Sequence, residues 1–183
     1  ILTNELKYSP NTQYKAELSE AATRSFDKYR QIARKLSGMG IDPTDAMDPY
    51  VERIETFHAR TNGADWHENV IKMYLVAGLL DDFYRRLAVG LDPLLRAEVE
   101  KALNDRQFDK FATKVLLEAM QLDVTLASRL ALWGRRLMGD TQLVARSALR
   151  LSGDGSEESR LEPVFTDLMG SHSKRMDALG LTA

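Results

Sequence analysis

The longest mostly apolar run in the chain, from Trp66 to Leu91, is the feature that most limits the folds open to it. Its apolar side chains recur at helical spacing and line one broad face: Val70, Ile71, Tyr74, Leu75, Leu79, Phe83 and Leu87. Between Tyr74 and Leu80, apolar side chains occupy almost the whole circumference of the predicted helix. Such a helix is normally covered by neighbours, so the run predicts the central helix of a bundle. Two aspartates, two arginines and a lysine interrupt it, and it is not expected to span a membrane.

Cap and turn signals divide the rest of the chain into further helices. They predict helices over about 12–36, 49–59, 66–91, 93–103, 107–120, 124–151 and 162–179. Asp42-Pro43-Thr44 reads as a turn, and Asp48-Pro49 reads as an N-cap with proline at the first helical position. The helix over 12–36 is predicted to bury one apolar face: Leu18, Ala22, Phe26 (or Ser25), Tyr29, Ile32 and Leu36. Nothing reads as a strand, so the chain is predicted to be all-α, with short connections that favour antiparallel neighbours.

The length and composition fit one globular domain. At 183 residues the chain can bury a core, and we expect a single domain over 1–183: a bundle over 1–151, a flexible Gly-rich linker over 152–160 and a packed C-terminal helix over 161–181. The absence of cysteine excludes disulfides, thiolate metal sites and a cysteine nucleophile. With no recognisable signal peptide, this favours a cytoplasmic protein. The net charge of −2 argues against a general attraction to nucleic acid.

The first residues of the chain lead to a prediction about its oligomeric state. Because the chain opens on Ile1 rather than on Met, residues 1–8 read as the end of an earlier helix. If no such helix completes the bundle, an apolar groove is left that a second copy can cover. We therefore expect a homo-oligomer, with a dimer as the simplest form.

Several segments in the same order resemble a known family. They are KYRQIARKLSGMGIDP (28–43), FHARTNGADW (57–66), LALWGRRLMGD (130–140) and KRMDALGL (174–181). Together they resemble a ferritin-like family of actinobacterial proteins over roughly residues 10–150 and the tail. That family is described as similar to the di-iron tRNA hydroxylase that oxidises a methylthio-isopentenyl adenosine. The resemblance implies a ferritin-like up-down bundle with extra short connecting helices and a C-terminal helix.

The resemblance also implies where di-iron ligands would lie. Such a site takes a Glu from each of two helices and a Glu-x-x-His from each of two others, whose spacing places both side chains on one face. Counted back from Gly40, the first Glu-x-x-His falls on Ser25 and Lys28, and neither side chain can replace an iron ligand. The Glu of the first helix would lie before Ile1. On the other helices the expected positions fall at or near Asp81, Asp82, Asp105, Phe108 and Asp109, with no histidine, so the di-iron ligands are predicted to be lost.

One Glu-x-x-His does occur, from Glu55 to His58, and His67 and Glu68 follow shortly after it. Carboxylates with imidazoles are what a Zn²⁺ or Fe²⁺ site uses. The motif lies on a short connecting helix, however, and a loop-bracing hydrogen bond from His58 is the simpler role. The enzyme hypothesis requires Glu55, His58, Glu68 and Asp81 or Asp82 to converge in space.

Other charged groups have simpler structural interpretations. Asp81 with Arg85 and Asp82 with Arg86 are spaced as i,i+4 ion pairs, which is favoured over paired catalytic carboxylates. Arg135 and Arg136 lie beside Trp133 and could hold a phosphate or stack a base, but they are predicted to form a solvated face, with Trp133 in the core.

Two glycines and a histidine complete the set of candidates. Gly78 and Gly134 lie inside long helices, which indicates close helix packing, with a ligand space left open as the alternative. His172 lies in a polar stretch and is predicted to be exposed.

The hypothesis favoured by these observations is a ferritin-like bundle with no metal or other cofactor, which acts as a non-catalytic binding or scaffolding protein. The alternative is a metal-dependent, di-iron hydroxylase or oxidase that acts on a modified tRNA nucleoside. An RNA-binding module without catalysis is a third possibility.

Overall fold

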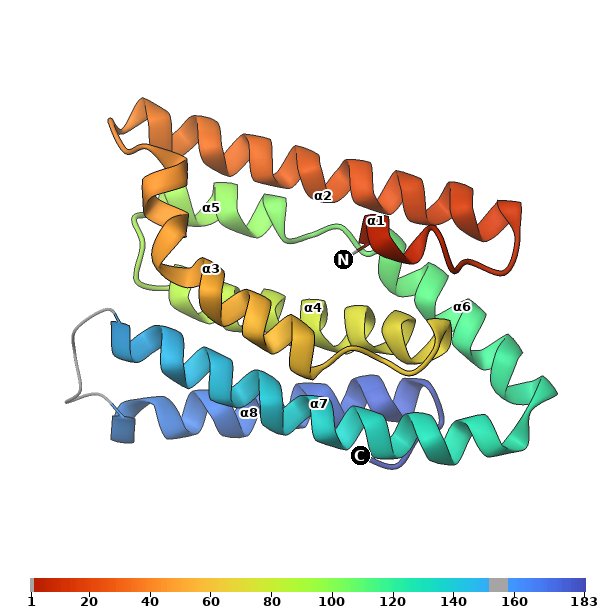
Figure 1. The fold of residues 1–183 in the computed structure, drawn as a ribbon. Coiled ribbons are helices and arrows are strands. Elements are labelled where there is room, and N and C mark those ends of the chain that lie inside the picture. The colour runs from red at the N-terminus through yellow and green to blue at the C-terminus, as the bar shows by residue number, and fades with distance from the viewer. Residues whose placement is uncertain (1, 152–157) are drawn as a thin grey trace. The chain divides into compact units, whose positions relative to one another are not determined.

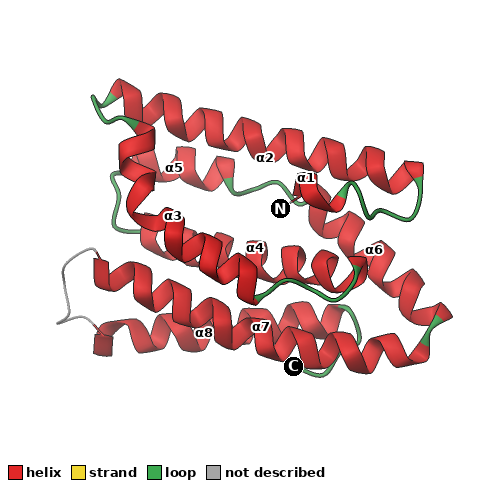
Figure 2. Ribbon diagram, in the orientation of Figure 1, coloured by secondary structure: helices red, strands yellow, loops and turns green. Residues whose placement is uncertain are grey.

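The computed structural model describes residues 2–151 and 158–183. Within these ranges the elements are helices and loops (Figure 2), which confirms the all-α prediction. The helices are α1 (Leu2–Glu5), α2 (Thr12–Gly38), α3 (Pro43–Arg60), α4 (Trp66–Ala88), α5 (Pro93–Ala102), α6 (Gln107–Leu122), α7 (Val124–Leu151) and α8 (Glu158–Ala178). Residues 152–157 of the predicted linker lie outside the described residues, whereas 158–160 belong to α8, so the linker prediction is wrong for these three residues. None of the described helices is long and apolar enough to cross a membrane.

Most helix starts fall where the sequence predicts them, because the capping side chains act locally. Asn11 accepts from the Tyr14 N–H at 2.8 Å, and Asp92 accepts from Leu94 N–H at 3.1 Å. The predicted start of α3 at Asp48-Pro49 is wrong. Asp42 accepts from the Thr44 N–H at 2.7 Å and α3 begins at Pro43 rather than at Pro49, so that Pro49 lies inside the helix.

The chain divides into two compact units, Ile1–Asn62 (unit 1) and Gly63–Ala183 (unit 2). In unit 1, α1 lies against α2, and α2 meets α3 near the turn that joins them (Figure 1). Gly40 adopts a φ of 78° in this turn, a backbone conformation that glycine adopts without strain. The predicted burial of the whole α2 face is wrong: Leu18 is buried, whereas Phe26, Tyr29 and Ile32 are exposed.

Unit 2 is organised around α4, as the sequence predicts. α4 lies against α5, α6, α7 and α8, and α7 lies beside α8 (Figure 1). Six of the seven residues of its predicted apolar face are buried: Val70, Ile71, Tyr74, Leu75, Leu79 and Phe83. Leu87, in the last turn of α4, is exposed and corrects the prediction. A helix covered by four neighbours buries most of its circumference, which explains the apolar run.

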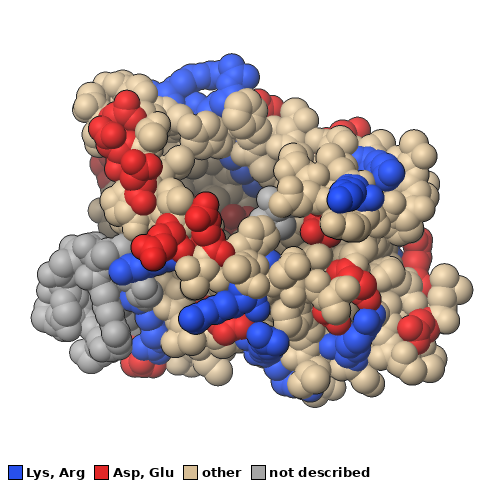
Figure 3. Space-filling view, in the orientation of Figure 1, with Lys and Arg blue, Asp and Glu red and all other residues tan. Residues whose placement is uncertain are grey.

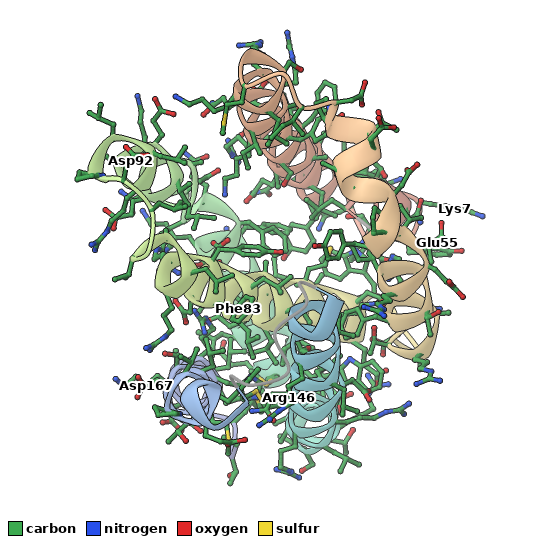
Figure 4. All side chains as sticks on the ribbon, turned by 90° about the vertical axis from the view of Figure 1, so that its left-hand side faces the viewer. Lys7, Glu55, Phe83, Asp92, Arg146 and Asp167 are labelled. Atoms are coloured by element: carbon green, nitrogen blue, oxygen red, sulfur yellow. The ribbon has the colours of Figure 1, made fainter. Side chains whose placement is uncertain are left out.

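The C-terminal helix α8 is part of this core. Phe83 of α4, which is labelled in Figure 4, packs with Phe165 and Leu168 of α8 in one buried cluster. Beyond the helix, Leu179 and Leu181 are buried, and Arg135 of α7 donates to the backbone oxygen of Thr182 at 2.8 Å. The residues after α8 are therefore packed into unit 2 as far as Thr182.

Candidate functional site

A largely buried ion pair joins the second half of α4 to α8. Arg175 Nη2 donates to Asp82 Oδ2 at 2.6 Å and to the backbone oxygen of Gly78 at 2.8 Å. The Arg175 side chain is 11% exposed and that of Asp82 is 19% exposed. Arg85 places a second guanidinium 3.6 Å from Asp82 Oδ1. The chain's own cations therefore neutralise this carboxylate where water screens charge only weakly.

Gly78 and Gly134 are the points at which α4 and α7 admit side chains of α8. A Cβ on Gly78 would lie 2.2 Å from Arg175 Nε, and a Cβ on Gly134 would lie 2.5 Å from Met176 Sδ. Both distances are shorter than two such atoms normally approach, so a side chain at either glycine would require the α8 side chain beside it to shift. The predicted role of these glycines in close helix packing is confirmed. The space beside each is filled by an α8 side chain.

The prediction that His172 is exposed is wrong. The residue is 4% exposed, and its ring is hydrogen-bonded to the backbone of Gly134. Burial lowers the pKa of His172 below its ordinary 6.5, Arg175 lowers it further, and the bond to Gly134 opposes both. His172 Nε2 is buried without a hydrogen-bond partner among the described residues.

Together these contacts fix α8 on α4 and α7. We name the residues that make them the α8 lock: Gly78, Asp82, Gly134, His172, Arg175 and Met176.

The polar sequence around His172 gives no indication that this residue is buried. Arg175 was not identified as a candidate residue from the sequence. The residues next to His172 are serines, with Lys174 close by, so the local pattern indicates a solvated stretch. The sequence signal that points to Arg175 is Gly78, since a glycine inside a long helix indicates that a bulky group approaches there. That signal gives the position of the contact on α4, but not the residue that makes it.

Charged side chains at the end of α4 are paired differently from the prediction. Arg86 Nη1 lies 2.8 Å from Asp167 Oδ2 of α8, not on Asp82, and Figure 4 shows Asp167 at the outer edge of α8. Arg85 also donates to the backbone oxygen of Leu103. The expected Asp82–Arg86 pair is therefore wrong, because α8 and the loop after α5 offer partners that lie far away in the sequence.

Glu68 belongs to a second polar cluster at the start of α4. Its Oε2 accepts from the Ala64 N–H at 2.7 Å, its Oε1 lies 3.6 Å from Arg129 Nε, and its backbone oxygen accepts from Trp133 Nε1 at 3.1 Å. Asp65 caps α4 at the Glu68 N–H and also pairs with Arg129. Burial raises the pKa of Asp65, but these two partners outweigh it and hold the pKa below 3.8. This cluster serves to cap α4 and tie it to α7.

The remaining candidate ligands are exposed, half-buried or already engaged within their own unit. Glu55 is exposed and projects from α3 (Figure 4), and His58 is half-buried on the same helix. On α2, Ser25 is exposed and Lys28 half-buried. At α6, Asp105 accepts from the Gln107 N–H, Asp109 pairs with Arg106, and Phe108 packs against Phe111.

These residues do not fit a di-iron centre. Over residues 2–151 and 158–183, no group of three or more His, Asp or Glu side chains is arranged to hold a metal ion. Asp82 and Asp109 face guanidinium groups, and a guanidinium repels a metal cation from the carboxylate that it neutralises.

The basic residues of α7 are also engaged within unit 2. Arg136 lies over the half-buried Trp133 ring, 5.2 Å from its centroid, and Arg146 pairs with Glu162 at 2.9 Å. Along the lower edge of Figure 3, where α7 and α8 lie, basic and acidic side chains are interspersed. This arrangement resembles a solvated helix face more closely than a phosphate-binding surface.

Comparison with known protein families matches residues 1–154 to a family described as Ferritin-like domain, actinomycetes. No curated protein matches the sequence. The family match ends before α8 begins, so the α8 residues of the lock, among them Arg175, lie outside it.

Proposed function

This chain belongs to the actinomycete ferritin-like domain family, and from that premise we propose that it works without a metal, as a self-associating binding or scaffolding protein in the cytoplasm. The observation that carries the proposal is the contact of Arg175 with Asp82 at 2.6 Å. A ferritin-like di-iron centre is held by carboxylates that project into the bundle core. Here Asp82, in the second half of the central helix, is neutralised by a guanidinium from α8.

The arrangement around this pair supports a built-in ionic contact. Arg175 enters through the notch left by Gly78, and it also donates to the backbone oxygen there. Arginine stays protonated at all physiological pH values and is part of the chain, so its positive charge is always present beside Asp82. Asp82 is also close to Arg85, so a divalent cation at this carboxylate would meet two fixed positive charges.

The alternative is a metal-dependent hydroxylase that acts on a modified tRNA nucleoside, as the resemblance to the di-iron enzyme implies. It requires ligands other than the ones considered above, because among the described residues no three of them are grouped to hold a metal ion, and Asp82 and Asp109 are paired with cations. The two hypotheses differ in a quantity that can be measured directly, the iron bound per chain.

The test is elemental analysis of untagged protein expressed with added iron and then loaded anaerobically with Fe²⁺. We expect no stoichiometric iron. Two irons per chain would overturn the proposal and make the hydroxylase the working hypothesis.

A matched pair of variants tests the role assigned to Arg175. Arg175→Gln removes the buried cation and is expected to lower the free energy of unfolding by about 3 kcal/mol. Arg86→Gln removes the exposed pair with Asp167 and is expected to lower it by less than about 1 kcal/mol. Equal effects of the two variants in urea denaturation would contradict the assignment of Arg175 as the buried counter-charge.

A further inference from the structure

Two helices of unit 1 expose apolar stripes. On α2 the stripe consists of Phe26, Tyr29 and Ile32, which we name the α2 stripe, and Phe26 is 57% exposed. The Phe26 and Tyr29 rings are stacked with their centroids 5.9 Å apart, so they form one aromatic surface. On α3 the stripe consists of Met47, Tyr50, Val51 and Ile54, all exposed, which we name the α3 stripe. Exposed apolar stripes with polar rims mark interaction surfaces.

The two stripes are bordered by opposite charges. Between residues 24 and 35, α2 carries five basic side chains and one acidic, Asp27: the basic ones are Arg24, Lys28, Arg30, Arg34 and Lys35. Between residues 45 and 55, α3 carries one basic side chain, Arg53, and four acidic ones: Asp45, Asp48, Glu52 and Glu55. Each chain therefore presents one basic and one acidic apolar surface.

The charges lie where they can border a contact. Successive residues on a helix are turned by about 100°, so Lys28 and Arg30 lie on either side of Tyr29. The Arg30 guanidinium lies 6.0 Å from the centroid of the Phe26 ring, at the edge of the stripe. On α3, Asp48 follows Met47 and Glu55 follows Ile54, and Figure 4 shows Glu55 projecting outward from this helix.

We propose that a second copy of this chain covers both stripes, with α2 of one protomer on α3 of its partner. A two-fold axis repeats the contact, so that each protomer contributes its basic stripe once and its acidic stripe once. Apolar side chains form the centre of the contact and opposite charges its border, which sets orientation and partner choice. Pairing α2 with α2 would instead bring like charges together. This inference names the surface for the self-association in the proposed function and rests on it.

Charge reversal tests the pairing. The α2-reversed variant is Lys28→Glu with Arg30→Glu, and the α3-reversed variant is Asp48→Lys with Glu55→Lys. Each variant alone brings like charges together in both contacts, so we expect the dissociation constant of its dimer to rise by about tenfold or more. An equimolar mixture restores opposite charges in both contacts of a mixed dimer. Sedimentation velocity over a concentration series measures all three samples.

A matched control distinguishes the effect of charges beside the α2 stripe from the effect of the net charge of the whole chain. Lys110→Glu with Lys114→Glu changes the net charge as the α2-reversed variant does, but on exposed positions of α6. This control is expected to dimerise as the unaltered chain does. Circular dichroism of every variant checks that the helices remain.

Several outcomes would overturn the inference. They are a monomeric unaltered chain at all concentrations, an α2-reversed variant that dimerises normally, and a mixture of the two reversed variants that stays monomeric. Protection of α2 and α3 from hydrogen exchange in a monomer would show that another part of the same chain covers the two stripes. This result would also overturn the inference. Stoichiometric iron with an intact dimer contact would overturn only the metal-free function, so the two failures are distinguishable.

Discussion

The helices α2 of unit 1 and α4 of unit 2 differ in how much of their apolar surface is buried. Both carry apolar residues at helical spacing. Phe83 of α4 is 5% exposed and packs on α8, whereas Phe26 of α2 is 57% exposed. Within their own units, α4 has four helices against it, while α2 has α1 and the start of α3.

The comparison shows that a helical period of apolar residues indicates a face to be covered, but not what covers it. In unit 2 the cover is provided by the same chain, including α8. In unit 1 the aromatic pair on α2 lies open, and we infer that a second copy covers it. Substitutions matched between the two units can break or sharpen this difference.

The largest expected effect separates Phe83 from Phe26. Phe83→Ala leaves a cavity against Phe165 and Leu168 and is expected to lower the free energy of unfolding by about 3–5 kcal/mol. Phe26→Ala is expected to change it by less than about 0.5 kcal/mol in the monomer. Urea denaturation at low protein concentration, followed by circular dichroism, measures both. A loss for Phe26→Ala as large as that for Phe83→Ala would show that α2 is buried in the monomer.

The next effect contrasts two glycines in unit 2. Gly78→Ala places a methyl group against Arg175 and is expected to destabilise the fold by about 1–3 kcal/mol. Gly139→Ala has nothing within 4 Å of the new methyl, so the better helix propensity of alanine should stabilise the fold by about 0.5–1 kcal/mol. Thermal and urea unfolding give the sign of each change. The same sign for both would contradict the close approach of α8 to α4.

The smallest effect concerns pH. Burial holds the pKa of His172 below 6.5, so the unfolded chain takes up a proton first as the pH falls. Stability should therefore decrease as the pH drops through 6.5 and level off below the folded pKa. Burial also lowers the pKa of His67, which adds a decrease of the same sign.

We expect His172→Gln to make the decrease in stability between pH 7.5 and about 5.5 shallower, with His67→Gln as the matched comparison. The low pKa of Asp65 acts in a separate window, below its ordinary 3.8, because that carboxylate is lost only at lower pH. Urea denaturation across this pH series provides the measurement. An unchanged slope in His172→Gln would show that the ring is not buried as a neutral group.

The sequence by itself determined the helical class, the central place of α4 and most helix starts. These features depend on contacts within a few residues, such as Asp65 accepting from the Glu68 N–H and Asp92 accepting from the Leu94 N–H. Apolar periodicity is equally local, and it indicates which helix needs neighbours on most sides. The start of α3 was misplaced because two Asp-Pro signals compete, and the first of them caps the helix.

Only the tertiary structure decided which groups meet. Asp82 and Arg175 are 93 residues apart, and although Gly78 indicates a close approach near Asp82, nothing in the sequence identifies Arg175 as the residue that makes it. His172 is buried because α8 packs its lock residues against Gly134, although its sequence neighbours are polar. The i,i+4 rule assigned Arg86 to Asp82, but Asp167 on α8 takes it instead. Such partners depend on the packing of distant helices, whereas caps and periodicity are properties of a single helix, and this is why the sequence predicts the elements better than the site.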